Sequence, residues 1–198
     1  MKQRTSNRLS LLRVITFVLC ASAIPALTTS CDNKSNAQDS ETEFTETYSG
    51  SFETAPAATD SNDDGKPANV GQFLGTSTFG SVSIQSLNEF EIVLENVNCD
   101  LSEDEFTLVR GNFVKRFSNG ELIFGTWDSG VSCFDPVTNI ATTTQVGTFL
   151  GGTGQFENAT GPIQIDYTST FLAVPSVDGF DFGGSSGTGF GTVIFNGD

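Results

Sequence analysis

Apolar and polar side chains alternate along much of the chain after residue 70. In PIQIDYTSTFL (162–172), Ile163 and Ile165 fall on one side of an extended chain, and Gln164 and Asp166 fall on the other. A period of two is typical of a β-strand with one buried and one polar face. Strand-forming runs also cover 89–98, 106–117, 121–134, 140–150 and 180–195, and a further strand is expected within 70–86.

Two of these runs predict finer detail. In FTLVRGNFVKRF, the apolar positions change sides around residues 110–111, which indicates a β-bulge. In ELIFGTWDSGVSCF, four side chains share one parity and are expected on one face, namely Ile123, Trp127, Val131 and Cys133.

Short turn sequences separate the runs. Asn119-Gly120 predicts a hairpin of type I′, in which both central residues need positive φ. DPVTN (135–139) predicts another turn, because Pro136 fixes its own backbone angle. Connections this short favour antiparallel neighbours.

GGTGQFENATG (151–161) is a glycine-rich connection between two strand-like runs. A phosphate-binding loop is excluded, because no lysine follows Gly154 and no segment of helical period comes after it. Glycine instead allows sharp bends at the corner of a β-barrel. Phe156 is expected to close the barrel there, and Gly161 to start the next strand.

The runs and turns together predict an all-β protein. We expect residues 70–198 to form a single antiparallel β-barrel of about eight strands, which leaves no free sheet edge. A two-sheet sandwich is the alternative.

The first 30 residues predict a signal peptide, with a basic start and an apolar run at 14–24 that is too short to span a bilayer comfortably. Its end allows two interpretations, either ordinary cleavage near residues 21–23 or lipidation of Cys31, because LTTSC resembles the lipobox of bacterial lipoproteins. Residues 31–69 are rich in acidic and small polar side chains and predict a flexible acidic linker. For 51–69, an exposed tail is an equal alternative.

Charge and composition exclude several functions. The chain has 24 acidic residues, and from residue 31 onward only five basic ones accompany them, which gives a net charge of −19. Such a surface repels nucleic acid and anionic lipid, so contact with a membrane is expected only through a lipid anchor. The chain has no histidine, which excludes Ser-His-Asp and Cys-His catalysis and histidine metal sites.

Two constellations could carry a site. DSNDDG (60–65) places Asp60, Asn62 and Asp64 at the spacing of a calcium loop, but Gly71 stands where an EF-hand needs a glutamate. A Ca²⁺ half-site or a solvated turn both fit this pattern.

Cys99 and Cys133 form an even pair in the expected folded part, which favours a disulfide in an oxidising compartment over two buried thiols. The acids at 103–105 are expected to be solvated in a loop.

GGTGQFENATG and the alternating strand after it resemble a segment of allene oxide cyclase-like and dirigent-like barrels. The chain from about 70 to 196 also resembles uncharacterised secreted bacterial barrel proteins. The resemblance implies a barrel fold and permits an isomerase or cyclase that acts on an apolar molecule inside the barrel. No catalytic residue can be carried over from it.

The leading hypothesis is an exported, lipid-anchored, non-enzymatic β-barrel of the periplasm or cell envelope, or a secreted one. It would bind a small apolar ligand or an envelope component. The alternatives are the isomerase or cyclase just named, and a calcium-stabilised adhesion or matrix module. A lumen filled with Phe and Ile side chains would count against the isomerase.

Overall fold

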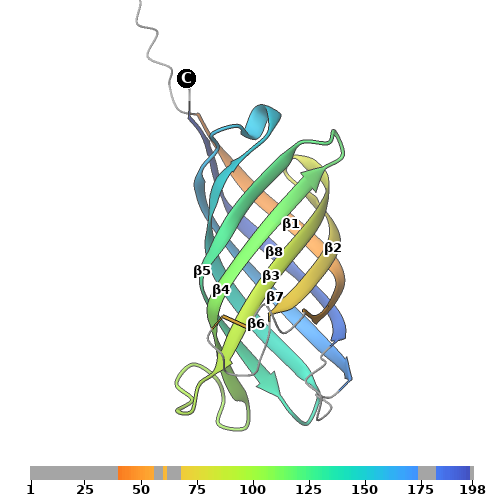
Figure 1. Cartoon of the computed structure of the whole chain (residues 1–198), viewed down its shortest axis with the longest axis vertical. Coiled ribbons are helices and arrows are strands. Elements are labelled where there is room, and N and C mark those ends of the chain that lie inside the picture. Colours follow the sequence, from red (N-terminus) through yellow and green to blue (C-terminus); the bar gives the residue numbers. More distant parts are fainter. Residues whose placement is uncertain (1–39, 56–59, 62–67, 174–181, 197–198) are drawn as a thin grey trace, which may run out of the picture. The chain divides into compact units, whose positions relative to one another are not determined.

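A computed structural model describes residues 40–55, 60–61, 68–173 and 182–196 as one closed antiparallel barrel of eight strands (Figure 1). The predicted all-β barrel is therefore confirmed. Among the described residues, no helix is long and apolar enough to cross a bilayer. In chain order the strands are β1 Ser40–Thr54, β2 Asn69–Ser77, β3 Gly80–Ile92, β4 Asp104–Phe117, β5 Leu122–Asp135, β6 Ile140–Gly152, β7 Gly161–Ala173 and β8 Phe182–Phe195.

The expected start of the barrel at residue 70 is wrong, because Ser40–Thr54 forms β1 and closes the barrel between β2 and β8. Its outward positions are Thr, Ser and Glu, which make the segment look like a polar linker. Its inward positions include Phe44, Tyr48 and Phe52, all of them buried. The alternation is that of a strand, but the buried set also includes Glu46.

A run predicted as one strand, 89–98, is divided in the structure. β3 ends at Ile92, and the chain from 93 to 103 is the β3–β4 loop. The expected bulge in β4 is confirmed, because Glu89 pairs with Arg110 whereas Phe90 pairs with Leu108. A second irregularity, between Trp127 and Ser129 of β5, was not expected.

This second irregularity overturns the predicted shared face of β5. Trp127 and Ser132 are buried in the barrel, whereas Cys133 lies on the outer wall and pairs with the exposed Thr142. An added residue in one strand moves the following side chains to the other face. Ile123 and Trp127 therefore face inward, and Val131 and Cys133 face outward.

The turns lie where the sequence predicts them, with one change of type. Gly120 has a φ of 87°, but Asn119 is not among the residues with positive φ. The Gly120 N–H donates to the carbonyl of Phe117, so the connection is a type I turn followed by a glycine rather than type I′. In the turn after β5, Asn139 takes the left-handed conformation, with a φ of 56°.

The glycine segment forms the expected corner. Gly154–Phe156 makes one 3₁₀ turn, η2, and Gly151, Gly154 and Gly161 all have positive φ. Phe156 is completely buried and packs against Phe117 with ring centroids 4.8 Å apart. Phe156 therefore closes this end of the barrel, here called the η2 end. The opposite end, with the β3–β4 loop, is called the loop end (Figure 1).

Aromatic rings fill the half of the lumen next to the η2 end, in one cluster that includes Phe44, Phe79, Phe113, Phe117, Phe149, Phe156 and Phe195. Glycine on the inner wall makes room for such rings. A Cβ at Gly147 would lie 2.2 Å from the carbonyl oxygen of Thr126 and 2.7 Å from the ring of Trp127. No larger residue fits at that position without moving the backbone.

The β3–β4 loop is fastened to the outer wall by a disulfide between Cys99 and Cys133, whose Cα atoms are 5.5 Å apart. Glu105, only 3% exposed, accepts the N–H groups of Val97 and Asn98, each at 2.7 Å. The backbone and side-chain amides of Asn98 lower the pKa of Glu105. Glu105 is therefore an ordering group of the loop, and the expectation that it is solvated is wrong.

We predict that Cys99→Ser together with Cys133→Ser lowers the free energy of unfolding by about 3–4 kcal/mol, because the bond closes a loop of 34 residues in the unfolded chain. Urea denaturation of the oxidised protein and the double variant measures the difference. The variant kept under reducing conditions is the control, because it should equal the reduced wild type. Equal stability of oxidised and reduced wild type would contradict the prediction.

Candidate functional site in the barrel lumen

A salt bridge lies inside the barrel, between Lys115 of β4 and Glu46 of β1. Lys115 Nζ donates a hydrogen bond to Glu46 Oε1, and the two side chains are 1% and 0% exposed. The ammonium also lies over the rings of Phe44 and Phe113, at 5.4 and 5.1 Å from their centroids. The pair therefore joins opposite parts of the wall across an aromatic environment.

Burial is costly for both charges of this pair. Desolvation lowers the pKa of Lys115, while the attraction and hydrogen bond of Glu46 act in the opposite direction. A buried pair repays its desolvation only with good geometry and further hydrogen bonds to the remaining polar atoms. The opposite charges of Lys115 and Glu46 cancel, so the pair adds no net charge to the lumen, although it makes this part of the lumen strongly polar.

Several buried polar atoms inside the barrel have no hydrogen-bond partner among the described residues. They belong to side chains that are at most 8% exposed, and they are Glu46 Oε2, Tyr48 Oη, Trp127 Nε1 and both amide atoms of Gln145. Burial, and then the nearby Tyr167 and Glu46, raise the pKa of Tyr48, so its hydroxyl keeps its proton. Buried polar groups are nearly always paired, so a cluster of exceptions marks a candidate site.

The members of this cluster lie on two parts of the inner wall, on β1 and on β5–β6. Tyr48 follows Glu46 by two residues on β1, and the ring of Trp127 packs on Phe113 at 4.5 Å. Trp127 pairs with Gly147, two residues along β6 from Gln145. Between them they offer N–H and O–H donors together with carboxylate and amide acceptors.

Toward the loop end the inner wall changes to small hydroxyl side chains. Thr143 donates to Ser132 at 2.9 Å, and the hydroxyls of Ser169 and Ser185 lie 2.6 Å apart. All four side chains are buried. The polar cluster thus lies between a lumen half packed with phenyl rings and a layer of hydroxyl groups, beyond which the rings of Phe52, Phe134 and Phe171 pack together at the loop end.

Glu89 anchors the described part of the β1–β2 connection at the loop end. Its carboxylate accepts the N–H and the hydroxyl of Ser61 at 2.6 and 2.7 Å, and Arg110 Nε at 2.6 Å. Burial alone would raise the pKa of Glu89, but the Ser61 hydrogen bonds and the Arg110 charge hold it below its ordinary value. Ser61 is in this way fastened to β3 and β4.

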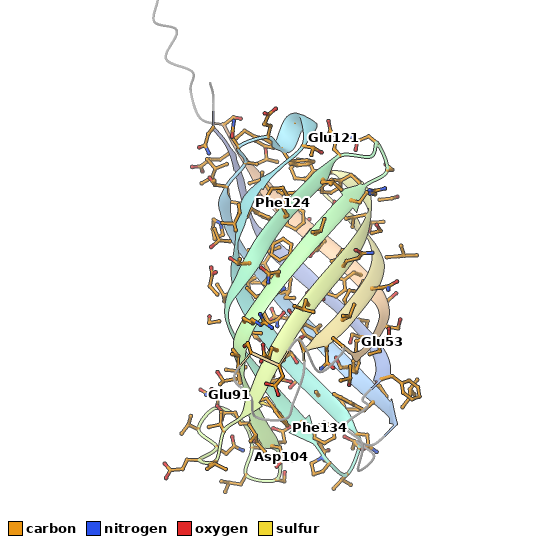
Figure 2. The ribbon with its side chains drawn as sticks, viewed as in Figure 1. Glu53, Glu91, Asp104, Glu121, Phe124 and Phe134 are labelled. Atoms are coloured by element: carbon orange, nitrogen blue, oxygen red, sulfur yellow. A yellow bond between two sulfur atoms is a disulfide. The ribbon has the colours of Figure 1, made fainter. Side chains whose placement is uncertain are left out.

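Figure 2 shows side chains both inside the barrel and on its outer wall, with Glu121 at the η2 end and Glu91 and Asp104 at the loop end. The polar side chains of β7 belong to the outer wall. Gln164, Asp166 and Thr168 point away from the lumen, since Ile163 and Ile165 are the buried residues.

The other residues predicted as sites from the sequence have different outcomes. Cys99 and Cys133 are bonded as expected. Of the three candidate calcium ligands, Asp60 is half-buried, and Asn62 and Asp64 lie outside the described residues. Cys31, the candidate lipidation site, also lies outside them.

Sequence reasoning missed the luminal pair, although a signal was present. Lys115 stands between Phe113 and Phe117 on the same parity, so the alternation places it inside. Glu46 has the same position between Phe44 and Tyr48. A charged residue at a position where the alternation expects a buried apolar one indicates a buried charge. The sequence does not indicate, however, that Lys115 pairs with Glu46, which is 69 residues away.

No family model matches the chain, and no curated protein matches it either. The candidate site therefore rests on the chemistry of its own residues.

We predict that Lys115→Met alone lowers the free energy of unfolding by about 3–5 kcal/mol, because it leaves the Glu46 carboxylate buried without its partner. Lys115→Met combined with Glu46→Leu should cost much less than the single change. Urea denaturation followed by Trp127 fluorescence measures all variants.

The matched control is Arg116→Met, which removes an exposed charge on the next residue and should change stability by no more than about 0.5 kcal/mol. A double variant as unstable as the sum of both single variants would show that the two side chains do not interact.

Proposed function

We propose that the protein is an exported, lipid-anchored, non-enzymatic β-barrel of the bacterial cell envelope that binds a small ligand in its lumen. The observation that carries this proposal is the buried cluster around Lys115 and Glu46, whose remaining polar atoms have no partner among the described residues. A bound molecule with complementary donors and acceptors would pair them. The predicted signal peptide in the first 30 residues and the lipobox-like sequence that ends at Cys31 support export.

The composition of the lumen favours a particular class of ligand. The Lys115–Glu46 pair is neutral as a whole, so an ionic ligand would enter with an uncompensated charge. The neighbouring rings of Phe44 and Phe113 offer apolar contact, and Tyr48, Trp127 and Gln145 offer hydrogen bonds. We therefore propose a small neutral molecule with an apolar body and a hydroxyl or carbonyl group.

Two alternatives stay open. An isomerase or cyclase acting on an apolar molecule is supported by the resemblance to allene oxide cyclase-like barrels and by the buried Glu46 carboxylate. The phenyl rings that fill the half of the lumen next to the η2 end count against it. A calcium-stabilised adhesion or matrix module is supported only by the spacing of Asp60, Asn62 and Asp64.

The single tryptophan of the chain, Trp127, provides the test. We predict that a neutral amphiphile such as decanol or a monoacylglycerol shifts Trp127 emission in a saturable way, because the indole lies in the polar cluster. Gln145→Leu should weaken this binding about threefold to tenfold, the effect of losing a net hydrogen bond. Fluorescence titration gives both dissociation constants.

Gln72→Leu is the matched control, because it makes the same change on the exposed face of β2 and should leave binding unaltered. Native mass spectrometry of the protein released from membranes checks for a ligand that is already bound. Emission that stays constant with every amphiphile, together with a mass that equals the processed chain alone, would end the proposal. Conversion of the added molecule would favour the isomerase.

The anchor has a separate test. We predict that the wild-type chain expressed in a bacterium sediments with membranes and gains the mass of a diacylglyceryl-modified Cys31 at its new N-terminus. Cys31→Ser should release it in soluble form. A soluble wild-type protein cleaved near residues 21–23 would show ordinary secretion instead.

A further inference from the structure

A second candidate site lies on the outer wall, away from the luminal cluster. The wall over β5–β8 is hollowed into a groove of about 610 Å³ beside the β3–β4 loop. Asn98 of the loop and Cys133 of β5 form one side, and outward residues of β6, β7 and β8 form the floor. Only one large aliphatic side chain, Val131, is among the lining residues of this groove.

The floor of the groove is a grid of oxygen atoms. One row across the strands is Thr142, Thr168 and Ser186, and a parallel row is Thr144, Asp166 and Thr188, as the strand pairing shows. Neighbouring strands are about 4.8 Å apart, and successive outward residues on one strand are about 7 Å apart. Such a grid presents hydrogen-bonding groups at regular intervals over an extended area.

Asp166 organises one row of the grid. Its Oδ1 accepts the hydroxyl of Thr144 at 2.7 Å, and its Oδ2 faces the Gln164 amide at the longer distance of 3.3 Å. The Thr144 proton is thereby directed to the carboxylate, which leaves the hydroxyl oxygen as an acceptor. In this row Thr144 and Asp166 therefore both present acceptors to a ligand.

The edge of the groove is held in place before any ligand arrives. The disulfide at Cys99 fixes the loop to the wall, and Glu105 accepts both the N–H and the side-chain amide of Asn98, at 2.7 and 2.6 Å. A fixed edge lowers the entropy that binding would cost. The groove is thus a preformed surface feature.

The lining selects a chemical class. It contains no basic residue, and the chain is strongly acidic, so an anion is excluded. Its single aliphatic side chain offers little to a lipid. Hydroxyl, amide and carboxylate groups suit a neutral molecule with many hydroxyls. Next to the grid, Phe190 is 48% exposed on the same face of β8 and can contact the apolar side of a sugar ring.

We propose that this groove binds a neutral oligosaccharide, extended across β6, β7 and β8. The site is separate from the proposed luminal ligand, because the side chains of its two hydroxyl rows lie on the outward positions of β6, β7 and β8. An exported barrel with such a groove can hold a neutral glycan at the cell envelope while its interior is occupied.

The test is calorimetric titration of the full processed chain with soluble dextran, laminarin and chitin oligosaccharides. At least one should bind in the millimolar range or tighter, with little dependence on salt because the ligand is neutral. Thr168→Val and Thr144→Val should each weaken binding about threefold to tenfold, since each removes a hydrogen bond.

Thr170→Val is the matched control, because Thr170 lies on the same strand and face as Thr168, is exposed, and is outside the groove. It should leave the dissociation constant unchanged. Absence of heat with all three sugars, or an equal effect of Thr170→Val, would overturn the proposal. Binding that alters Trp127 emission and ignores the groove variants would overturn it as well, since the sugar would then occupy the lumen.

Discussion

Pairing of the first strand with the last is the constraint on which the rest of the structure depends. β1 and β8 are matched along fourteen residue pairs, from Ser40 with Phe195 to Glu53 with Phe182. This ladder turns a meander into a ring and removes both sheet edges. It also separates the inner wall from solvent, so that side chains of β1 and β4 meet across a closed space. Without this closure, the Lys115–Glu46 pair would be an exposed contact of little consequence.

Closure explains why the two faces of the same strands have such different chemistry. Inside, a charged pair and its polar neighbours lie between phenyl rings and hydroxyl groups, and every unpaired atom there is costly. Outside, threonine, serine and glutamate occupy many of the outward positions and are solvated, beside exposed apolar side chains such as Leu74 and Phe190. One strand, β7, contributes Ile165 to the core and Asp166 to the outer groove. The alternation that folds the barrel therefore also separates the two sites at which we propose binding.

Much of the fold could be predicted from the sequence, and the exceptions have identifiable causes. β7 was found because Ile163 and Ile165 repeat without interruption. β1 has the composition of a linker, because Glu46 interrupts its buried set and its outer positions are polar. Cys133 points outward because of the irregularity between Trp127 and Ser129. No sequence motif predicts this irregularity as clearly as Asn-Gly predicts a turn. The luminal site needs partners 69 residues apart, and such distances are fixed only by closure.

The register between Ser40 and Phe195 has a further consequence. Because the two ends of the described barrel lie side by side, each of the eight strands pairs with two neighbours, and the ring has no first or last strand in space. A short peptide could join these ends, and new termini could open in the exposed turn at Asn119-Gly120 without cutting a strand. In such a rearranged chain, β1 and β8 would become a local hairpin, and the pairing most distant in sequence would shift to β4 and β5.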